Sequence, residues 1–189
     1  MILASSSPRR LDILRQAGIE PEVRPQDIDE TPLSGESPES LVERLARTKA
    51  LSAAADAAGR TVIAADTIVW MDGELLGKPA DAADAVRMLS ELSGRSHHVS
   101  TGVCAIAQAG TAGQKLRSFV ETTEVRFFEL TPAQIEAYVD TGEPMDKAGA
   151  YGYQAKGCTL VESIAGDYYN VVGLPIGRLL RILADMGAL

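Results

Sequence analysis

The sequence is poor in cysteine, because its 189 residues include only Cys104 and Cys158. The two lie far apart and outside any Cys-x-x-Cys spacing, so the sequence offers neither a redox motif nor a cysteine pair for zinc. Each falls in an apolar stretch that resembles a strand, which predicts two buried thiols. We therefore expect no disulfide and no redox chemistry.

Long apolar runs are also missing. No segment approaches the roughly 20 apolar residues that a membrane-spanning helix needs. Residues 1–5 lack the basic region that opens a secretory signal peptide. We therefore expect a cytoplasmic protein with no membrane partner.

Positive charge is scarce as well, since the formal net charge is −8. Proteins that bind nucleic acid non-specifically need a positive field, so a nucleic-acid partner is not expected. A small anionic ligand remains compatible with this charge if basic residues gather locally and a divalent metal adds positive charge. The length and the 46% hydrophobic content predict one folded domain over residues 1–189 with a sizeable core.

The stretch from Thr61 to Ala65 holds small or β-branched residues without charge and predicts a strand buried on both faces. We expect this strand to end at Asp66. A carboxylate at the edge of a core needs a metal, a cation or a substrate beside it. An Asp-Gly turn within residues 71–74 predicts a hairpin that returns Lys78 toward Asp66. These residues alone leave a structural ion pair and a catalytic site equally open.

The segment after residue 7 carries clear helix signals. Ser7 is a good N-cap, Pro8 suits the first helical position, and the helix is expected over about residues 8–17. Arg9 and Arg10 lie at the positive end of the helix dipole, where cations are disfavoured. With three serine hydroxyls beside them, they indicate an anion-binding corner suited to nucleotide phosphates. The alternative is two arginines that simply stay solvated.

A second helix is predicted from Ser37-Pro38 to about residue 57, after an acidic loop at 27–33. Its apolar spacing places Lys49 on the face that should be buried. Such a lysine commonly extends to the surface, and the other interpretation is a functional ammonium.

The rest of the chain alternates helices and strands. His97 and His98 have no partner at ligand spacing, so a structural or solvent-facing role is expected. The predicted elements are a helix after Asp81 ending at Gly94, strands at 97–107 and 116–128, a helix from 131 to about 142, a strand at 158–164, a loop at 167–175 and a helix from Pro175.

Residues 142–157 contain four glycines, two lysines and small residues, and they predict an irregular loop that lets the backbone approach a ligand closely. Tyr151, Tyr153 and Gln154 stand together in it. The loop matches neither the P-loop nor the dinucleotide-binding fingerprint.

Taken in order, these segments resemble the Maf family of nucleoside triphosphate pyrophosphatases. The matching pieces are residues 4–10, 46–50, 65–67, 77–79, 100–103, 142–144, 147–152, 166–168 and 170–175. The resemblance implies an α/β fold with a bent mixed β-sheet flanked by helices, and two lobes around a central cleft, similar to the inosine triphosphatase architecture.

The resemblance also implies cleavage of a nucleoside triphosphate between the α and β phosphates, with Mg²⁺ or Mn²⁺. Asp66 would be the general base and a metal ligand, and Glu30 a second metal carboxylate. Positive charge would come from Arg10, Lys49 and Lys78, and hydroxyl donors from Ser5 or Ser7. A homodimer is implied by resemblance alone.

Arg9, Thr67 and Gln154 resemble the version of the family that prefers dTTP and UTP. Uracil and thymine present an acceptor, a donor and an acceptor along one edge, and a carboxamide such as that of Gln154 complements two of them. Tyr153 stands where many relatives are expected to carry an aliphatic residue. Two alternatives stay open: a pyrophosphatase for 7-methyl-GTP or inosine triphosphate, and a nucleotide-binding regulator of cell division without turnover.

Overall fold

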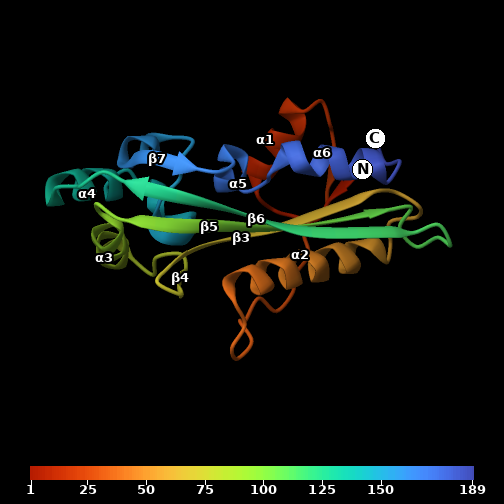
Figure 1. Ribbon diagram of the computed structural model, residues 1–189, viewed down its shortest axis with the longest axis horizontal. Coiled ribbons are helices and arrows are strands. Elements are labelled where there is room, and N and C mark those ends of the chain that lie inside the picture. The colour runs from red at the N-terminus through yellow and green to blue at the C-terminus, as the bar shows by residue number, and fades with distance from the viewer. The chain divides into compact units, whose positions relative to one another are not determined.

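The computed structural model describes residues 1–189 and has a mixed α/β fold. Seven strands form one sheet in the order β2-β1-β3-β5-β6-β7, with β4 beside β3 (Figure 1). Strand β1 pairs in parallel with β2 and β3, whereas β3–β4 and β6–β7 are antiparallel. The expected class, a mixed sheet with helices, is confirmed.

The chain divides into two compact units. Unit 1 comprises Met1–Asp66, Thr101–Glu121 and Gly173–Leu189, and unit 2 comprises Thr67–Ser100 and Thr122–Val172. Three strands contribute residues to both units: β3 (Val62–Met71), β5 (Ser96–Ala107) and β6 (Lys115–Phe127). That the whole chain is one domain of two lobes around a cleft stays a prediction.

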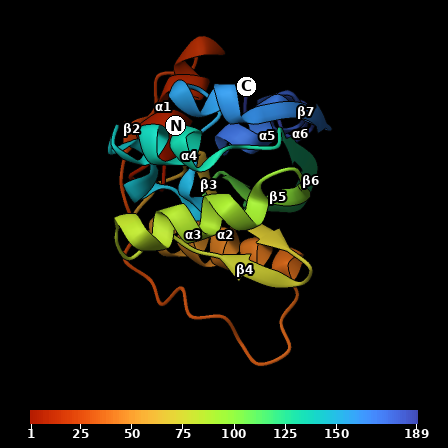
Figure 2. The same cartoon turned by 90° about the vertical axis from the view of Figure 1, so that its left-hand side faces the viewer.

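Unit 1 owes its packing to small side chains. Helix α2 (Pro38–Ala54) turns Ala46, Ala50 and Ala53 toward a buried cluster with residues of the strands, such as Ala64 and Cys104. Helix α2 lies on one side of these strands, and α1 and α6 lie on the other (Figures 1 and 2). The other elements of unit 1 are β1 (Ile2–Leu3), α1 (Pro8–Gln16), β2 (Glu22–Val23) and α6 (Ile176–Asp185).

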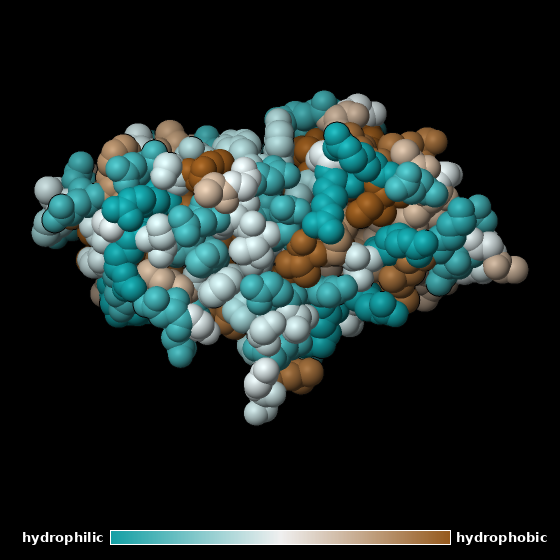
Figure 3. All heavy atoms as spheres, viewed as in Figure 1, coloured by the Kyte–Doolittle hydropathy of each residue, from teal (hydrophilic) through white to brown (hydrophobic).

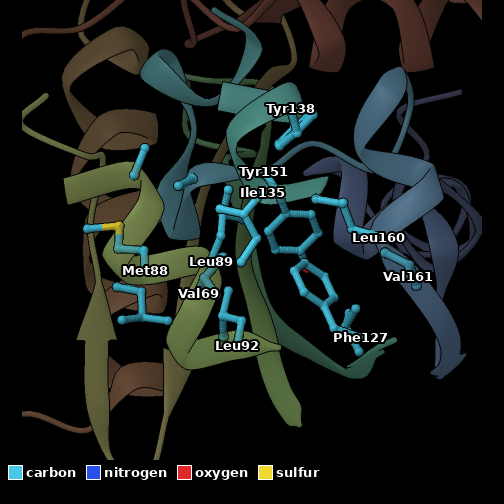
Figure 4. Packing of buried hydrophobic residues seen from close by; sticks show 14 of the residues in the cluster. Val69, Met88, Leu89, Leu92, Phe127, Ile135, Tyr138, Tyr151, Leu160 and Val161 are labelled. Atoms are coloured by element: carbon cyan, nitrogen blue, oxygen red, sulfur yellow. The ribbon is translucent and has the colours of Figure 1, made fainter. Parts of the chain in front are cut away.

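Unit 2 has a core of larger side chains, including Phe127, Tyr138 and Tyr151 (Figure 4). Two helices of unit 2 start where they were predicted and are capped there, because Asp81 accepts from the Asp84 N–H and Thr131 forms a capping box with Gln134. The elements wholly within unit 2 are β4 (Glu74–Leu76), α3 (Ala82–Leu92), α4 (Pro132–Val139), β7 (Val161–Ala165), α5 (Tyr168–Val172) and three 3₁₀ helices, η1 (Glu143–Asp146), η2 (Ala148–Ala150) and η3 (Lys156–Leu160).

The prediction that the strand ends at Asp66 is wrong, because β3 continues to Met71. The residues after Asp66 include β-branched and aromatic side chains that favour a strand, and β4 pairs with this second half in antiparallel register. The expected hairpin is confirmed, with Met71 opposite Glu74. Asp66 therefore lies within a strand.

Four further predictions are corrected. Cys158 is exposed, because it lies on the 3₁₀ helix η3, and the strand expected from residue 158 begins at Val161; only Cys104 is buried. The expected loop at 167–175 contains helix α5, since the Asp167 carboxylate accepts from two N–H groups at its start, those of Tyr169 and Asn170. The segment 142–157 is not irregular throughout, because short 3₁₀ helices interrupt it.

No helix of the fold combines the length and the apolar character that crossing a membrane requires. On the face shown in Figure 3, hydrophobic atoms appear as separate patches among hydrophilic ones. Large exposed hydrophobic residues include Leu33, Phe128 and Leu189.

His97 is buried in unit 2, which gives it the structural role expected for this histidine pair. Its Nε2 lies 2.7 Å from the Tyr151 hydroxyl oxygen, its ring meets those of Phe127 and Tyr151 edge-on, and its Nδ1 has no partner. Burial, with a smaller contribution from His98, lowers the pKa of His97 to about 3. Burial raises the pKa of the facing Tyr151, so this hydroxyl stays protonated.

This lowered pKa predicts a loss of stability in mild acid. The unfolded chain protonates His97 below its ordinary pKa near 6.5 and the folded chain does not, so stability falls as the pH falls below that value. Between pH 7 and pH 5 we expect this histidine to cost about 2 kcal/mol of unfolding free energy. Urea denaturation at both pH values measures it. His97→Gln should reduce the difference by that amount, whereas His98→Gln, at the ring that stacks on Trp70, should not. An unchanged difference in His97→Gln contradicts the assignment.

Candidate active site

The start of α1 holds an arginine in a fixed direction. Ser5 is buried, and its Oγ accepts from the Ser7 N–H at 3.2 Å and from Arg10 Nη1 at 3.1 Å. The Nε of Arg10 donates to the carbonyl oxygen of Gly173 at 2.9 Å. Ser7 occupies the expected N-cap position, but its side chain makes no capping hydrogen bond. The buried Ser5 and the Gly173 carbonyl thus orient the guanidinium.

Arg10 lies in a neighbourhood of both signs. Desolvation lowers its pKa, the carboxylates of Asp66 and Glu30 raise it, and the neighbouring charge of Arg9 lowers it. A guanidinium stays protonated through such shifts, so Arg10 remains a cation. The arginine corner and the two acids therefore belong to one electrostatic environment.

Lys49 and Asp66 form a buried ion pair within unit 1. Lys49 is 8% exposed on the inner face of α2, and Asp66 is 8% exposed on β3. The Nζ of Lys49 lies 2.6 Å from Asp66 Oδ1 and 2.6 Å from Glu30 Oε1. Asp66 Oδ1 and Glu30 Oε1 therefore lie close together, on one shared ammonium nitrogen. The lysine does not extend to the surface; it links two carboxylates.

Glu30 comes from a different kind of segment. It lies between β2 and α2, in a stretch without helix or strand that Figure 1 shows as a loop beside α2. Its side chain is 59% exposed, in contrast to the 12% of Asp66. One acid is thus fixed by a strand, and the other reaches the same ammonium from an accessible loop.

Seven of the predicted site residues belong to unit 1. The contacts above join six of them in two groups, Ser5 with Ser7 and Arg10, and Lys49 with Asp66 and Glu30. Three belong to unit 2. Thr67 follows Asp66 on β3, Lys78 lies exposed after β4, and Gln154 lies exposed in the turn at 153–155. Within unit 1, Lys49 contacts Asp66. A shared site for Lys78 and Gln154 stays a prediction.

Sequence reasoning missed the role of Gly173. Gly173 lies in the segment 170–175, which resembles the Maf family, but no role was predicted for it. Its backbone carbonyl oxygen accepts a hydrogen bond from Arg10. A backbone acceptor leaves no side-chain signal, so only the fold reveals it.

The acids also bear on metal binding. No group of three or more His, Cys, Asp or Glu residues is placed to hold a metal ion. Asp66 and Glu30 nevertheless converge on one cation, the Lys49 ammonium, and present the carboxylate oxygens that Mg²⁺ and Mn²⁺ prefer. The residues fit a divalent ion that takes its remaining ligands from water and phosphate oxygens.

Comparison with known proteins identifies the family. The model of the family Maf, described as Maf-like protein, matches residues 1–186. The chain belongs to the Maf family. The dTTP/UTP pyrophosphatase of Symbiobacterium thermophilum is 52% identical to this Maf chain over 187 residues, 99% of the chain and 94% of the relative. The dTTP/UTP pyrophosphatase of Geobacter metallireducens is 51% identical over 189 residues, 100% of the chain and 97% of the relative.

A solved structure supports the fold of this Maf chain. The chain resembles the solved structure of a HAM1 protein from Coxiella burnetii with a TM-score of 0.53 and 18% sequence identity, over 97% of this chain and 98% of that protein. This likeness shows the fold alone.

Proposed function

We propose that this Maf protein is an enzyme that hydrolyses dTTP and UTP to the nucleoside monophosphate and pyrophosphate, acting in the cytoplasm. Relatives with that name are about half identical over nearly the whole chain. The observation that carries the proposal is the cluster in unit 1, where Lys49 is held between Asp66 and Glu30 near Arg10. Such a mixture of charges suits a polyanion that reacts beside a carboxylate.

In this proposal the cations bind and orient the phosphates. Arg10 and Lys49, with Lys78 and Arg9, offset the triphosphate charge, and the hydroxyls of Ser5 and Ser7 donate to phosphate oxygens. Phosphate oxygens compete with the acids for the Lys49 ammonium. The carboxylate of Asp66 is then available to a water molecule.

The proposed reaction is an in-line displacement. A water oxygen attacks the α-phosphorus, and Asp66 accepts the proton that the water loses. The bond between the α-phosphorus and the oxygen bridging to the β-phosphate breaks, and pyrophosphate leaves. Asp66 and Glu30 would hold a divalent metal, Mg²⁺ or Mn²⁺, which supplies further positive charge for the phosphates.

We propose that Gln154 recognises the nucleobase of the substrate, and that Thr67 and Arg9 assist it. The carboxamide of Gln154 offers an acceptor and donors, which complement the donor and acceptors along the edge of uracil or thymine. Cytosine presents an acceptor and a donor where uracil presents a donor and an acceptor, so it would pair poorly with a carboxamide held in the orientation that suits uracil.

A panel of triphosphates tests this function. We expect kcat/KM with dTTP and UTP to exceed that with dCTP by roughly 10- to 100-fold, the discrimination of one two-point hydrogen-bond match. Pyrophosphate release is measured with Mg²⁺ or Mn²⁺ present, and chelation of the metal should abolish it. If 7-methyl-GTP or inosine triphosphate is preferred, the assigned substrate is wrong and the enzyme class stands. Tight dTTP binding without turnover in the presence of either metal would instead favour a nucleotide-binding regulator of cell division. Sedimentation of the same preparation tests the homodimer.

A further inference from the structure

We propose that Glu143 and Tyr138 are positioning residues, which fix both ends of the segment Gly152–Gly157 so that Gln154 is presented in one direction. This inference rests on the proposed function, in which Gln154 reads the base. All contacts that support it lie within unit 2.

Glu143 directs both of its carboxylate oxygens at one end of this segment. Its Oε2 accepts from the Lys156 N–H at 3.1 Å, and its Oε1 accepts from the Gly157 N–H at 3.3 Å. Hydrogen bonds to a charged acceptor are about twice as strong as neutral ones. The carboxylate therefore anchors the segment by its backbone, whatever side chains the segment carries.

Tyr138 fixes the other end and links it to the same acid. Its hydroxyl accepts from the Gly152 N–H at 3.2 Å and donates to Glu143 Oε1 at 3.0 Å. Burial raises the pKa of Tyr138, so its hydroxyl keeps the proton that it donates. Its ring belongs to the buried core cluster of unit 2, as do Tyr151 and Ile135 (Figure 4). The anchor is thereby tied to a rigid part of the protein.

Two glycines make this close packing possible. A Cβ on Gly157 would overlap the Gly152 carbonyl oxygen and approach the Tyr138 hydroxyl oxygen to 2.8 Å. A Cβ on Gly152 would lie 2.7 Å from Cδ of Lys147, whose Nζ donates to the Glu143 carbonyl oxygen at 2.6 Å. A side chain at Gly157 would therefore displace the Tyr138 hydroxyl and the Gly152 backbone, whereas one at Gly152 would press on the flexible side chain of Lys147.

The anchored segment gains little from burial of its own side chains. Gln154, Ala155 and Lys156 are exposed, and Tyr153 is half-buried. Ordering backbone costs about 1–2 kcal/mol per residue, so a polar anchor is needed where apolar burial is small. Gln154 lies midway between the anchored N–H groups, in the turn at 153–155. The anchor therefore fixes the segment that carries Gln154, whose carboxamide is proposed to recognise the nucleobase.

The test compares Glu143→Gln, Glu143→Ala and Tyr138→Phe with Gln154→Ala. We expect each to raise KM for dTTP and UTP by roughly tenfold with kcat within about twofold, because the variants weaken binding of the base and spare the reacting phosphates. The preference for dTTP over dCTP should fall in the same variants. Amide hydrogen exchange should accelerate at least about tenfold at Gly152, Lys156 and Gly157 in the Glu143 variants.

Controls separate this inference from the function itself. Glu136→Gln, at an exposed position on α4, should behave as the wild type. If Glu143→Ala does not fold, the near-isosteric Glu143→Gln and Tyr138→Phe carry the test. If Gln154→Ala raises KM while the Glu143 and Tyr138 variants keep wild-type KM and exchange, the inference is overturned and the proposed function stands. If Gln154→Ala has no effect, or if the wild type does not turn over dTTP, base reading by Gln154 fails and the inference fails with it. Combining Glu143→Gln with Gln154→Ala should add little to either single change.

Discussion

Asp66→Asn is expected to lower kcat for dTTP and UTP by about 10³-fold, because an amide cannot accept the proton of the attacking water. The asparagine keeps the shape and one acceptor oxygen, and Lys49 retains its ion pair with Glu30. The protein should therefore remain folded. Pyrophosphate release at saturating substrate and magnesium measures the loss, and a thermal melt of the same sample verifies folding.

Asp56→Asn is the matched control for this change, since Asp56 is exposed just after α2 and the substitution alters charge equally. It should leave kcat within about twofold, as surface substitutions usually do. Equal turnover by Asp66→Asn and wild type would refute Asp66 as the base. An unfolded Asp66→Asn protein would instead assign the Asp66–Lys49 pair a structural role.

Gly102→Ala should destabilise the protein by about 3 kcal/mol or more. Gly102 lies on β5, and a Cβ there would overlap the backbone carbonyl of Val42 and lie 2.7 Å from the Glu43 nitrogen. Because the obstacle is helix backbone, it cannot be relieved by a rotamer change, and α2 must move as a whole. Urea denaturation measures the loss of unfolding free energy.

Gly77→Ala provides the comparison for this glycine. A Cβ at Gly77 would meet nothing within 4 Å, and its backbone is outside the region that favours glycine. This substitution should be neutral or slightly stabilising, because alanine restricts the unfolded chain. Similar unfolding free energies for the two variants would show that α2 does not need the glycine for its close approach to β5.

Much of the fold could be predicted because local signals agreed with the tertiary structure. The helix starts at Asp81 and Thr131 and the Asp-Gly hairpin appear where the sequence places them. Helical spacing also placed Lys49 on a buried face, where the structure has it. In each case the signal depends on residues within a few positions of one another.

The remainder depended on contacts between distant segments. A charge at Asp66 argued for the end of a strand, yet pairing with β4 carries β3 on to Met71. Helix α5 begins where the side chain of Asp167 caps it, in the stretch 167–175 that was predicted to be a loop. Cys158 is exposed because the chain forms a 3₁₀ helix there in place of a strand. The carbonyl of Gly173 and the Glu143 anchor could be found only in the structure.

The alanines on the inner face of α2 constrain more than packing. Ala46, Ala50 and Ala53 let this helix settle close to the strands, and the same helix carries Lys49. A bulkier residue at any of the three would push the helix outward and draw the ammonium away from Asp66. The small side chains of these three alanines therefore determine how deeply the Lys49 ammonium is buried. Substitution of any of them would change the contact between Lys49 and Asp66, although the alanines themselves contact no reacting group.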